Sequence, residues 1–99
     1  MNELARQKLI EAALSGVRQI KGNYTDGRGG FCAMGVLGWA DPDKNAIDHV
    51  VMMSEQYGLI AYADCPFECG KSRMAQRDLV IHLNDDHDLD FLGIAHKMP

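Results

Sequence analysis

Four side chains in the second half of the chain carry the clearest chemistry. Cys65, Cys69, His82 and His87 form the pattern C-x3-C-x12-H-x4-H. Thiolate sulfur and imidazole nitrogen are ligands that zinc prefers, and four of them close a tetrahedral site. The spacing falls within the range of two-cysteine, two-histidine zinc sites. A zinc-binding module is therefore one hypothesis for this chain, and two thiols in a turn with two unrelated histidines is the competing interpretation.

The zinc hypothesis depends on where one helix begins. Ser72 is a good N-cap, and we predict a helix that starts there. At 1.5 Å per residue, His82 would then lie about 15 Å along the helix from Ser72. The chain between Cys69 and Ser72 spans at most about 10 Å. This helix separates Cys69 from His82, whereas a start near Arg77, with residues 71–76 as strand and turn, would bring them together.

Cys32 is a second candidate, because it follows a glycine-rich loop at the start of an expected helix. A helix N-terminus stabilises a thiolate, and His82 or His87 with Asn84 would complete a cysteine hydrolase set. The alternative is a buried cysteine among apolar neighbours. Since no oxyanion hole or substrate cleft can be named, we predict a protein without catalytic residues and keep a Cys32-dependent enzyme as an alternative.

A cluster of aspartates suggests a binding surface near the C-terminus. Carboxylates gathered on a surface complement a basic partner, and aromatic side chains anchor interfaces. The predicted partner-binding residues are Asp85, Asp86, His87 and Asp88, with Tyr62 and Phe67 as aromatic anchors.

Composition narrows the function classes. The chain has 99 residues, 46% of them hydrophobic and 24% charged, and a formal net charge of -4. This acidic balance argues against direct nucleic-acid binding and favours a protein partner, such as one with a basic, nucleic-acid-binding groove. The odd count of 3 cysteines and the absence of a leader pattern or a long apolar run predict a cytoplasmic protein with reduced thiols and no membrane segment.

Hydrophobic periodicity predicts a mainly α, compact single domain, residues 1–99, of four to five helices. The first helix is expected from Asn2 to about Lys21. Phe31–Ala40 is apolar on every side and is expected as the central buried helix, with glycines that allow a neighbouring helix or loop to approach closely. The apolar stripe of the first helix is predicted to consist of Ile10, Ala13, Leu14, Val17 and Ile20.

Capping signals place two further helices. Asp41 and Pro42 begin a helix that ends near Gly58, and Asp90 caps a short C-terminal helix. Residues 59–63 are expected to form a short strand or an extended connection. The C-terminal helix is predicted to have one apolar face, made of Phe91, Ile94, Ala95 and Met98.

Two short stretches resemble a known group of proteins. Cys32-Ala33-Met34-Gly35-Val36-Leu37 resembles the Cys-Ala-x-Gly-Ala-Leu helix of small uncharacterised bacterial and phage proteins, and Leu83-Asn84-Asp85 followed by Asp90-Phe91 resembles their Asn-Asp turn and short C-terminal helix. The resemblance implies a compact helical fold and a phage or mobile-element origin. It also implies that Asn84 and Asp85 tie a turn between two helices and that Cys32 packs in the core. It implies no reaction.

These observations lead to one function and two alternatives. The leading prediction is a small cytoplasmic protein-binding or inhibitor protein, in its most concrete form a phage anti-defence accessory factor. The first alternative is the zinc module, and the second is the enzyme that uses Cys32. The sequence leaves open whether the glycine-containing helix packs within the chain or across a homodimer interface.

Overall fold

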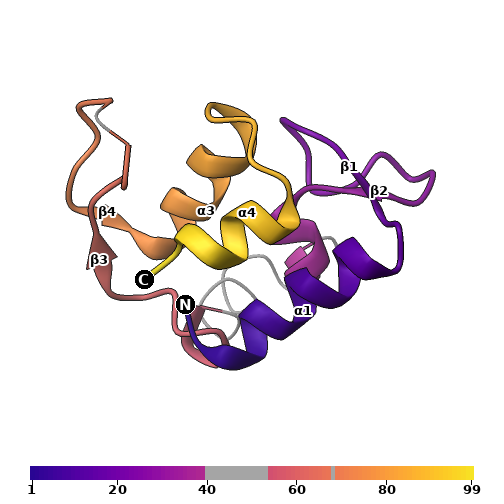
Figure 1. Cartoon of the computed structure of the whole chain (residues 1–99), viewed down its shortest axis with the longest axis horizontal. Coiled ribbons are helices and arrows are strands. Elements are labelled where there is room, and N and C mark those ends of the chain that lie inside the picture. Colours follow the sequence, from indigo (N-terminus) through magenta and orange to yellow (C-terminus); the bar gives the residue numbers. More distant parts are fainter. Residues whose placement is uncertain (40–53, 68) are drawn as a thin grey trace.

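The computed structural model describes residues 1–39, 54–67 and 69–99, which form helices and two small sheets (Figure 1). Ser54 to Gln56 are helical, whereas the predicted caps Asp41 and Pro42 lie outside the described residues. The elements, in chain order, are α1 (Glu3–Leu14), β1 (Arg18–Gln19), β2 (Gly30–Phe31), the π-helical η1 (Gly35–Trp39), β3 (Tyr62–Ala63), β4 (Met74–Ala75), α3 (Gln76–Asp85) and α4 (Phe91–Lys97).

The first helix is shorter than predicted and buries a different face. Gly16 adopts a φ of 73°, so its N–H bonds to the Ala13 carbonyl at 3.2 Å, while the Val17 N–H bonds to the Ala12 carbonyl at 3.0 Å. This pair of bonds is a Schellman motif, which ends a helix. The buried residues of α1 are Ala5, Leu9 and Ala12. The predicted end near Lys21 was wrong. Of the predicted stripe, Ile10, Ala13 and Val17 are partly buried against the core, whereas Leu14 is 78% exposed.

The strand β1 follows α1 and pairs in parallel with β2. Phe31 therefore lies in a strand, and the central helix begins after it, at Ala33, rather than at Phe31 as predicted. Ala40, its predicted end, lies outside the described residues. Gly35 meets the expectation of close approach, because a Cβ added there would overlap the Tyr24 carbonyl. Within this segment the buried residues are Cys32, Ala33, Met34, Gly35 and Leu37.

The C-terminal helix is as predicted. The Asp90 side chain accepts a hydrogen bond from the Gly93 N–H at 2.7 Å, which is the N-cap interaction. Phe91, Ile94 and Ala95 are buried on α4, and Met98 after it is buried as well. In Figure 1 α4 lies between α1 and α3, and it packs against both. The hydrophobic core therefore brings α1, from the start of the chain, together with α3 and α4 from its end.

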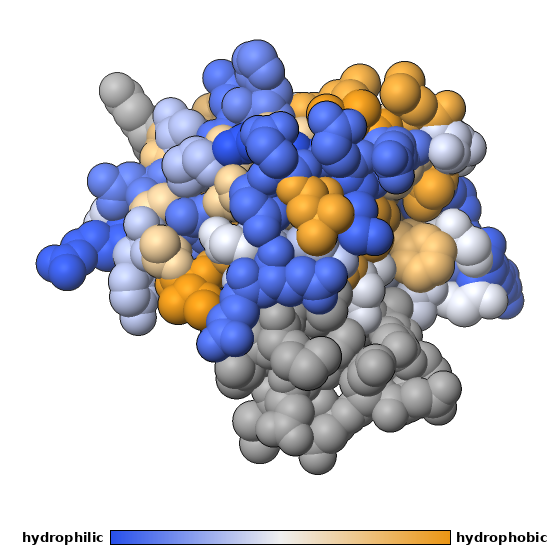
Figure 2. Space-filling view, turned by 90° about the horizontal axis from the view of Figure 1, so that it is seen from below, coloured by the Kyte–Doolittle hydropathy of each residue, from blue (hydrophilic) through white to orange (hydrophobic). Residues whose placement is uncertain are grey.

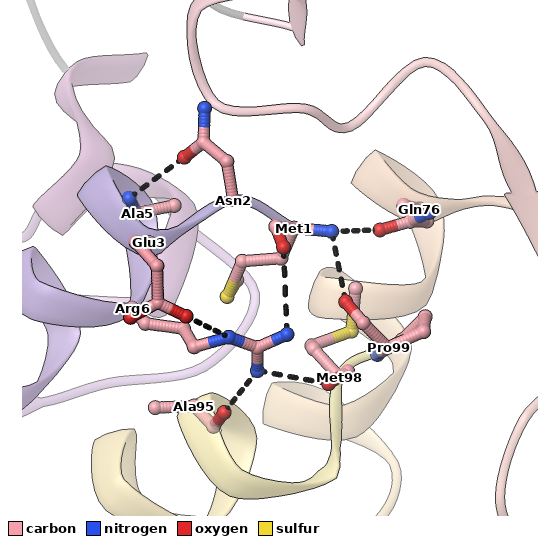
Figure 3. A network of polar contacts seen from close by, with 9 residues as sticks. All are labelled: Met1, Asn2, Glu3, Ala5, Arg6, Gln76, Ala95, Met98 and Pro99. Atoms are coloured by element: carbon pink, nitrogen blue, oxygen red, sulfur yellow. Dashed lines mark hydrogen bonds and ion pairs between the residues drawn. The ribbon is translucent and has the colours of Figure 1, made fainter.

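Arg6 joins α1 to the end of α4 (Figure 3). Its Nη1 donates to the carbonyls of Ala95 at 2.6 Å and Met98 at 2.9 Å, and its Nη2 donates to the Met1 carbonyl at 3.4 Å. The carbonyls at a helix C-terminus lack partners within the helix, so a charged donor there is valuable. Figures 1 and 3 also show the two chain ends side by side, and the Met1 amine donates to the Pro99 carbonyl at 3.1 Å.

We expect Arg6→Met to lower the free energy of unfolding by roughly 1–3 kcal/mol, the contribution of hydrogen bonds to a charged group. The methionine keeps an apolar stem, so packing changes little. Arg77→Met is the matched control, since the Arg77 ion pair with Asp78 is on the surface and is worth less than about 1 kcal/mol. Urea unfolding measures both, and equal losses would contradict this role for Arg6.

Hydrophobic side chains are also present on the surface. Figure 2 shows them both singly among hydrophilic groups and gathered near one edge of that face. Isolated exposed apolar residues are usual in small proteins. Among the helices of the described residues, none is long and apolar enough to span a membrane. Within residues 1–39, 54–67 and 69–99, the large exposed hydrophobic residues are Leu4, Leu14, Tyr24, Ile60, Tyr62 and Leu92.

Candidate metal centre

The structure brings the four residues of the C-x3-C-x12-H-x4-H pattern together. One ligand atom from each of Cys65, Cys69, His82 and His87 lies within 4.8 Å of the corresponding atoms of the other three. The two cysteines lie in the loop between β3 and β4, His82 lies on α3, and His87 follows the end of that helix. Cys65 and His82 are buried, His87 is half-buried and Cys69 is exposed.

The late start of α3 makes this arrangement possible. β4 pairs antiparallel with β3, so Met74 and Ala75 are strand residues rather than helical ones. The N–H groups of Gln76 and Arg77 then bond to the carbonyls of Ala61 at 3.0 Å and Leu59 at 3.2 Å. The predicted helix start at Ser72 was therefore wrong. The helix begins at Gln76, one residue from the position that the zinc hypothesis requires.

A hairpin loop positions the two thiols. The expected strand at residues 59–63 is confirmed in part, as β3. Beyond it, the Cys65 N–H bonds to the Lys71 carbonyl at 3.2 Å, and the Cys69 N–H bonds to the Phe67 carbonyl at 2.8 Å in a tight turn. Gly70, with a φ of 85°, occupies a backbone conformation that favours glycine. The loop thus turns both cysteines toward α3.

The end of α3 positions the two histidines. Five residues along a regular helix correspond to a rotation of about 140°, so His82 and His87 would point apart on a longer helix. Instead α3 ends at Asp85, and the N–H groups of Asp86 and His87 both bond to the His82 carbonyl, at 2.9 and 3.3 Å. The chain folds back over the helix end, and the two imidazole Nε2 atoms lie 3.1 Å apart.

The separations match a tetrahedral ion. Zinc bonds of about 2.3 Å to sulfur and about 2.05 Å to nitrogen place sulfur and nitrogen about 3.5 Å apart and two nitrogens about 3.3 Å apart. Cys65 Sγ lies 3.5 Å from His87 Nε2, and Cys69 Sγ lies 3.3 Å from His82 Nε2. Together with the 3.1 Å between the imidazoles, three edges of the tetrahedron have the expected length within about 0.3 Å.

Asp86 orients one of the imidazoles. Its Oδ2 lies 2.8 Å from His82 Nδ1, and the two residues are one helical turn apart. A proton on Nδ1 leaves the Nε2 lone pair free to bind a metal, and zinc-bound histidines usually have such a carboxylate partner. Sequence reasoning did not assign Asp86 this role, although its spacing of four residues from His82 was a usable signal.

Phe67 packs on the other imidazole. Its ring stacks on that of His87, with centroids 4.6 Å apart and an angle of 24° between the planes. Lys97 places its ammonium 5.8 Å above the Phe67 ring. The predicted anchor Phe67 is therefore half-buried beside the candidate metal centre. Tyr62, the other predicted anchor, is 73% exposed on β3.

The electrostatics of the centre favour a thiolate at Cys69. The pKa of Cys69 is lowered to about 6 by a backbone hydrogen bond at Lys71 and by hydrogen bonds with His82 and His87. Burial raises the pKa of Cys65. Burial alone would lower the pKa of His82, but its contacts with Cys69 and Asp86 outweigh that effect and raise it. With a pKa of about 6, Cys69 is mostly deprotonated at neutral pH. Zinc binds cysteine as the thiolate, so this is the form of Cys69 that the metal needs.

The predicted acidic surface makes contacts within its own chain. The Asp85 Oδ1 accepts a hydrogen bond from the Asn84 amide at 2.8 Å, and Asp88 pairs with Lys21. Asp86 contacts His82, as described above. His87, which the sequence placed both in this surface and in the zinc set, has its imidazole in the metal cluster. Partner binding by these residues stays a prediction.

Cys32 is a core residue with an unreactive environment. It is 6% exposed, its Sγ accepts a hydrogen bond from the Gly35 N–H at 3.4 Å, and burial raises its pKa. A raised pKa is the opposite of the shift expected for a thiolate at a helix N-terminus. Among the described residues, no polar contact joins the Cys32 thiol to His82 or His87. The buried position agrees with the packing role implied by the resemblance.

Asn84 joins three segments of the fold through its side chain. It is 1% exposed, and its Oδ1 accepts from the Ala33 N–H at 3.1 Å and from Gln19 Nε2 at 2.8 Å. Its Nδ2 donates to the Ile20 carbonyl at 2.9 Å and to Asp85. All its hydrogen-bonding capacity is used. Asn84 thus joins α3 to the segments beside β1 and η1, a wider role than the turn implied by the resemblance.

No protein-family model matches this chain, and no curated protein or solved structure matches it either. The candidate metal centre is therefore supported by the residues and geometry of this chain alone.

Proposed function

We propose that this chain is a small zinc-binding module in which Zn²⁺ is held by Cys65, Cys69, His82 and His87. The observation that carries the proposal is the convergence of these four ligand atoms within 4.8 Å of one another. They come from a hairpin loop, a helix and the turn after that helix, so local sequence proximity alone does not account for their meeting. Two thiolates and two imidazoles are a common structural zinc set.

The metal would have a structural role. Four protein ligands fill a tetrahedral shell and leave no position for a substrate or an activated water. The strands on either side of the cysteine loop are only two residues each, and a hairpin that short is marginal in water without further support. An ion bound to both the hairpin loop and the end of α3 would fix them together, so part of the binding free energy becomes folding free energy.

The module would act by binding a protein partner. Tyr62 on β3 is 73% exposed, and Ile60, two residues before it, is 56% exposed. An exposed tyrosine has the apolar body and polar tip of a typical interface anchor. A hairpin held by zinc would present these side chains rigidly, which reduces the entropy lost on binding. An inhibitor protein of phage or mobile-element origin, the origin that the resemblance implies, is the most concrete version of such a protein.

Zinc analysis tests the proposal directly. We expect protein purified in zinc-containing buffer and dialysed without chelator to retain about one zinc per chain. A strong chelator should remove the metal. The amide NMR signals from the β3–β4 hairpin and α3 should then lose their dispersion. Cys32→Ala is the control, because its thiol lies outside the ligand set and zinc should be retained. Zinc that dialysis removes from the unaltered protein would overturn the proposal.

Asp86→Ala should weaken zinc binding by roughly 10–100-fold, the usual effect of removing a carboxylate that orients a histidine ligand. The physical reason is that His82 would lose the partner that fixes its tautomer and ring orientation. Asp78→Ala is the matched control, since Asp78 is an exposed aspartate on the same helix whose ion-pair partner is Arg77. Competition with a chromogenic chelator measures both affinities. Equal affinities in the two variants would contradict this role for Asp86.

A further inference from the structure

We propose that the zinc centre is also an oxidation-sensitive thiol site, at which the Cys69 thiolate attacks a hydroperoxide and Cys65 then forms a disulfide with it, so that the metal is released. The proposal rests on the proposed zinc function. It adds a chemical class of reactant, the hydroperoxides, and a consequence, release of the hairpin from α3.

The two cysteines differ in access. Cys69 is exposed, whereas Cys65 is buried at 9% exposure beside half-buried Phe67. A peroxide molecule approaching from solvent therefore meets the Cys69 sulfur first. Oxidation of thiols follows thiolate character and exposure, and zinc keeps both cysteines in the thiolate form. Access, rather than protonation, then decides which sulfur reacts.

The second thiolate is placed to complete the reaction. The Cys65 and Cys69 sulfurs belong to one cluster whose ligand atoms all lie within 4.8 Å of one another. A disulfide bond of about 2.05 Å thus requires an approach of less than about 3 Å. Both cysteines lie outside the regular strands, between β3 and β4. Gly70, beside Cys69, has a φ of 85°, and glycine adopts a wider range of backbone conformations than other residues. The loop can therefore shorten this distance without breaking a strand pair.

The chemistry balances with hydrogen peroxide as the oxidant. The Cys69 thiolate attacks one peroxide oxygen, the O–O bond breaks, and sulfenic acid and hydroxide form. The Cys65 thiolate then attacks the Cys69 sulfur, the S–S bond forms, and a second hydroxide leaves with the S–O bond electrons. Two thiolates lose two electrons, and the peroxide gains them. Neither disulfide sulfur remains a thiolate ligand, so only His82 and His87 could still hold the ion, and Zn²⁺ dissociates.

Ligand-preserving variants separate the two cysteine roles. Cys69→His and Cys65→His each keep four zinc ligands while removing one thiol, and Cys32→Ala removes the unrelated thiol. The zinc-loaded proteins are treated with hydrogen peroxide, zinc release is followed with a chromogenic indicator, and the products are identified by mass spectrometry with dimedone trapping. Addition of a dithiol reductant with zinc tests reversibility.

The unaltered protein and Cys32→Ala should release zinc together with formation of a Cys65–Cys69 disulfide, and the dithiol should restore the bound metal. Cys69→His should release zinc at least about tenfold more slowly, because its remaining ligand thiol is buried. Cys65→His should form a trapped sulfenic acid at Cys69 and no disulfide. Equal rates for Cys69→His and the unaltered protein, or zinc bound stably through oxidation, would overturn the proposal. Absence of zinc before peroxide is added would instead refute the zinc function itself.

Discussion

Replacing Cys65 by alanine should abolish stable zinc binding and lower the free energy of unfolding in zinc-containing buffer by more than about 4 kcal/mol, the range reached when a metal site is lost. Cys65 is buried in the loop, and its sulfur lies 3.5 Å from His87 Nε2. Its removal leaves three ligands and frees the hairpin loop from α3. Urea unfolding with and without zinc measures the effect.

Cys32→Ala is the matched control for this experiment. Both cysteines are buried, at 9% and 6% exposure, so the loss of a packed sulfur is similar in the two variants. Only Cys65 belongs to the ligand set. The zinc-dependent part of the stability should therefore vanish in Cys65→Ala and persist in Cys32→Ala. The account is contradicted if zinc stabilises both variants equally.

Asn84→Leu should lower the free energy of unfolding by roughly 3–5 kcal/mol, because it breaks a buried hydrogen-bond network. This is the largest loss of stability that we expect from a change outside the four candidate ligands. Leucine has a similar size but removes the partner of the Ala33 N–H and of the Ile20 carbonyl, and it leaves the Gln19 amide with only its bond to the Leu89 carbonyl. Urea unfolding at saturating zinc measures this loss independently of the metal.

Asn23→Leu is the control for Asn84→Leu, since Asn23 is exposed in the loop after β1 and surface substitutions usually change stability by less than about 0.5 kcal/mol. Similar losses for the two variants would show that the network around Asn84 is not important for stability. Asn84→Asp measures the contribution of the amide donors alone, because it keeps an acceptor but loses both N–H donors of the side chain.

The sequence singled out the four residues of the candidate metal centre, as an alternative to the leading prediction, but it did not predict the backbone that brings them together. Spacing alone selected the four ligands, since zinc chemistry limits which residue types bind. The helix start was missed because Ser72 is a strong local cap signal, whereas β4 exists through pairing with β3, more than ten residues earlier. A strand of two residues carries no detectable periodicity. The sequence therefore contained no sign of the β3–β4 pairing that prevents a helix from starting at Ser72.

The two terminal helices show what local signals can decide. Asp90 caps α4 as predicted, because an aspartate before an apolar run is a specific signal. The end of α1 was missed although Gly16 provides a local stop signal. The apolar residues Val17 and Ile20 continued the helical spacing and favoured the longer helix, yet the Schellman motif ends it. Three of the four hydrogen bonds of Asn84 join segments that are distant in sequence, and no local sequence pattern predicts such contacts.

X-ray absorption at the zinc edge is the most direct test of the central claim. The account predicts that zinc retained by the purified protein has two sulfur neighbours at about 2.3 Å and two nitrogen neighbours at about 2.0–2.1 Å, with the outer-shell scattering of imidazole. In Asp86→Ala the same shell should persist with weaker imidazole order. A shell of oxygen and nitrogen without sulfur, or protein that retains no zinc at all, would contradict the account.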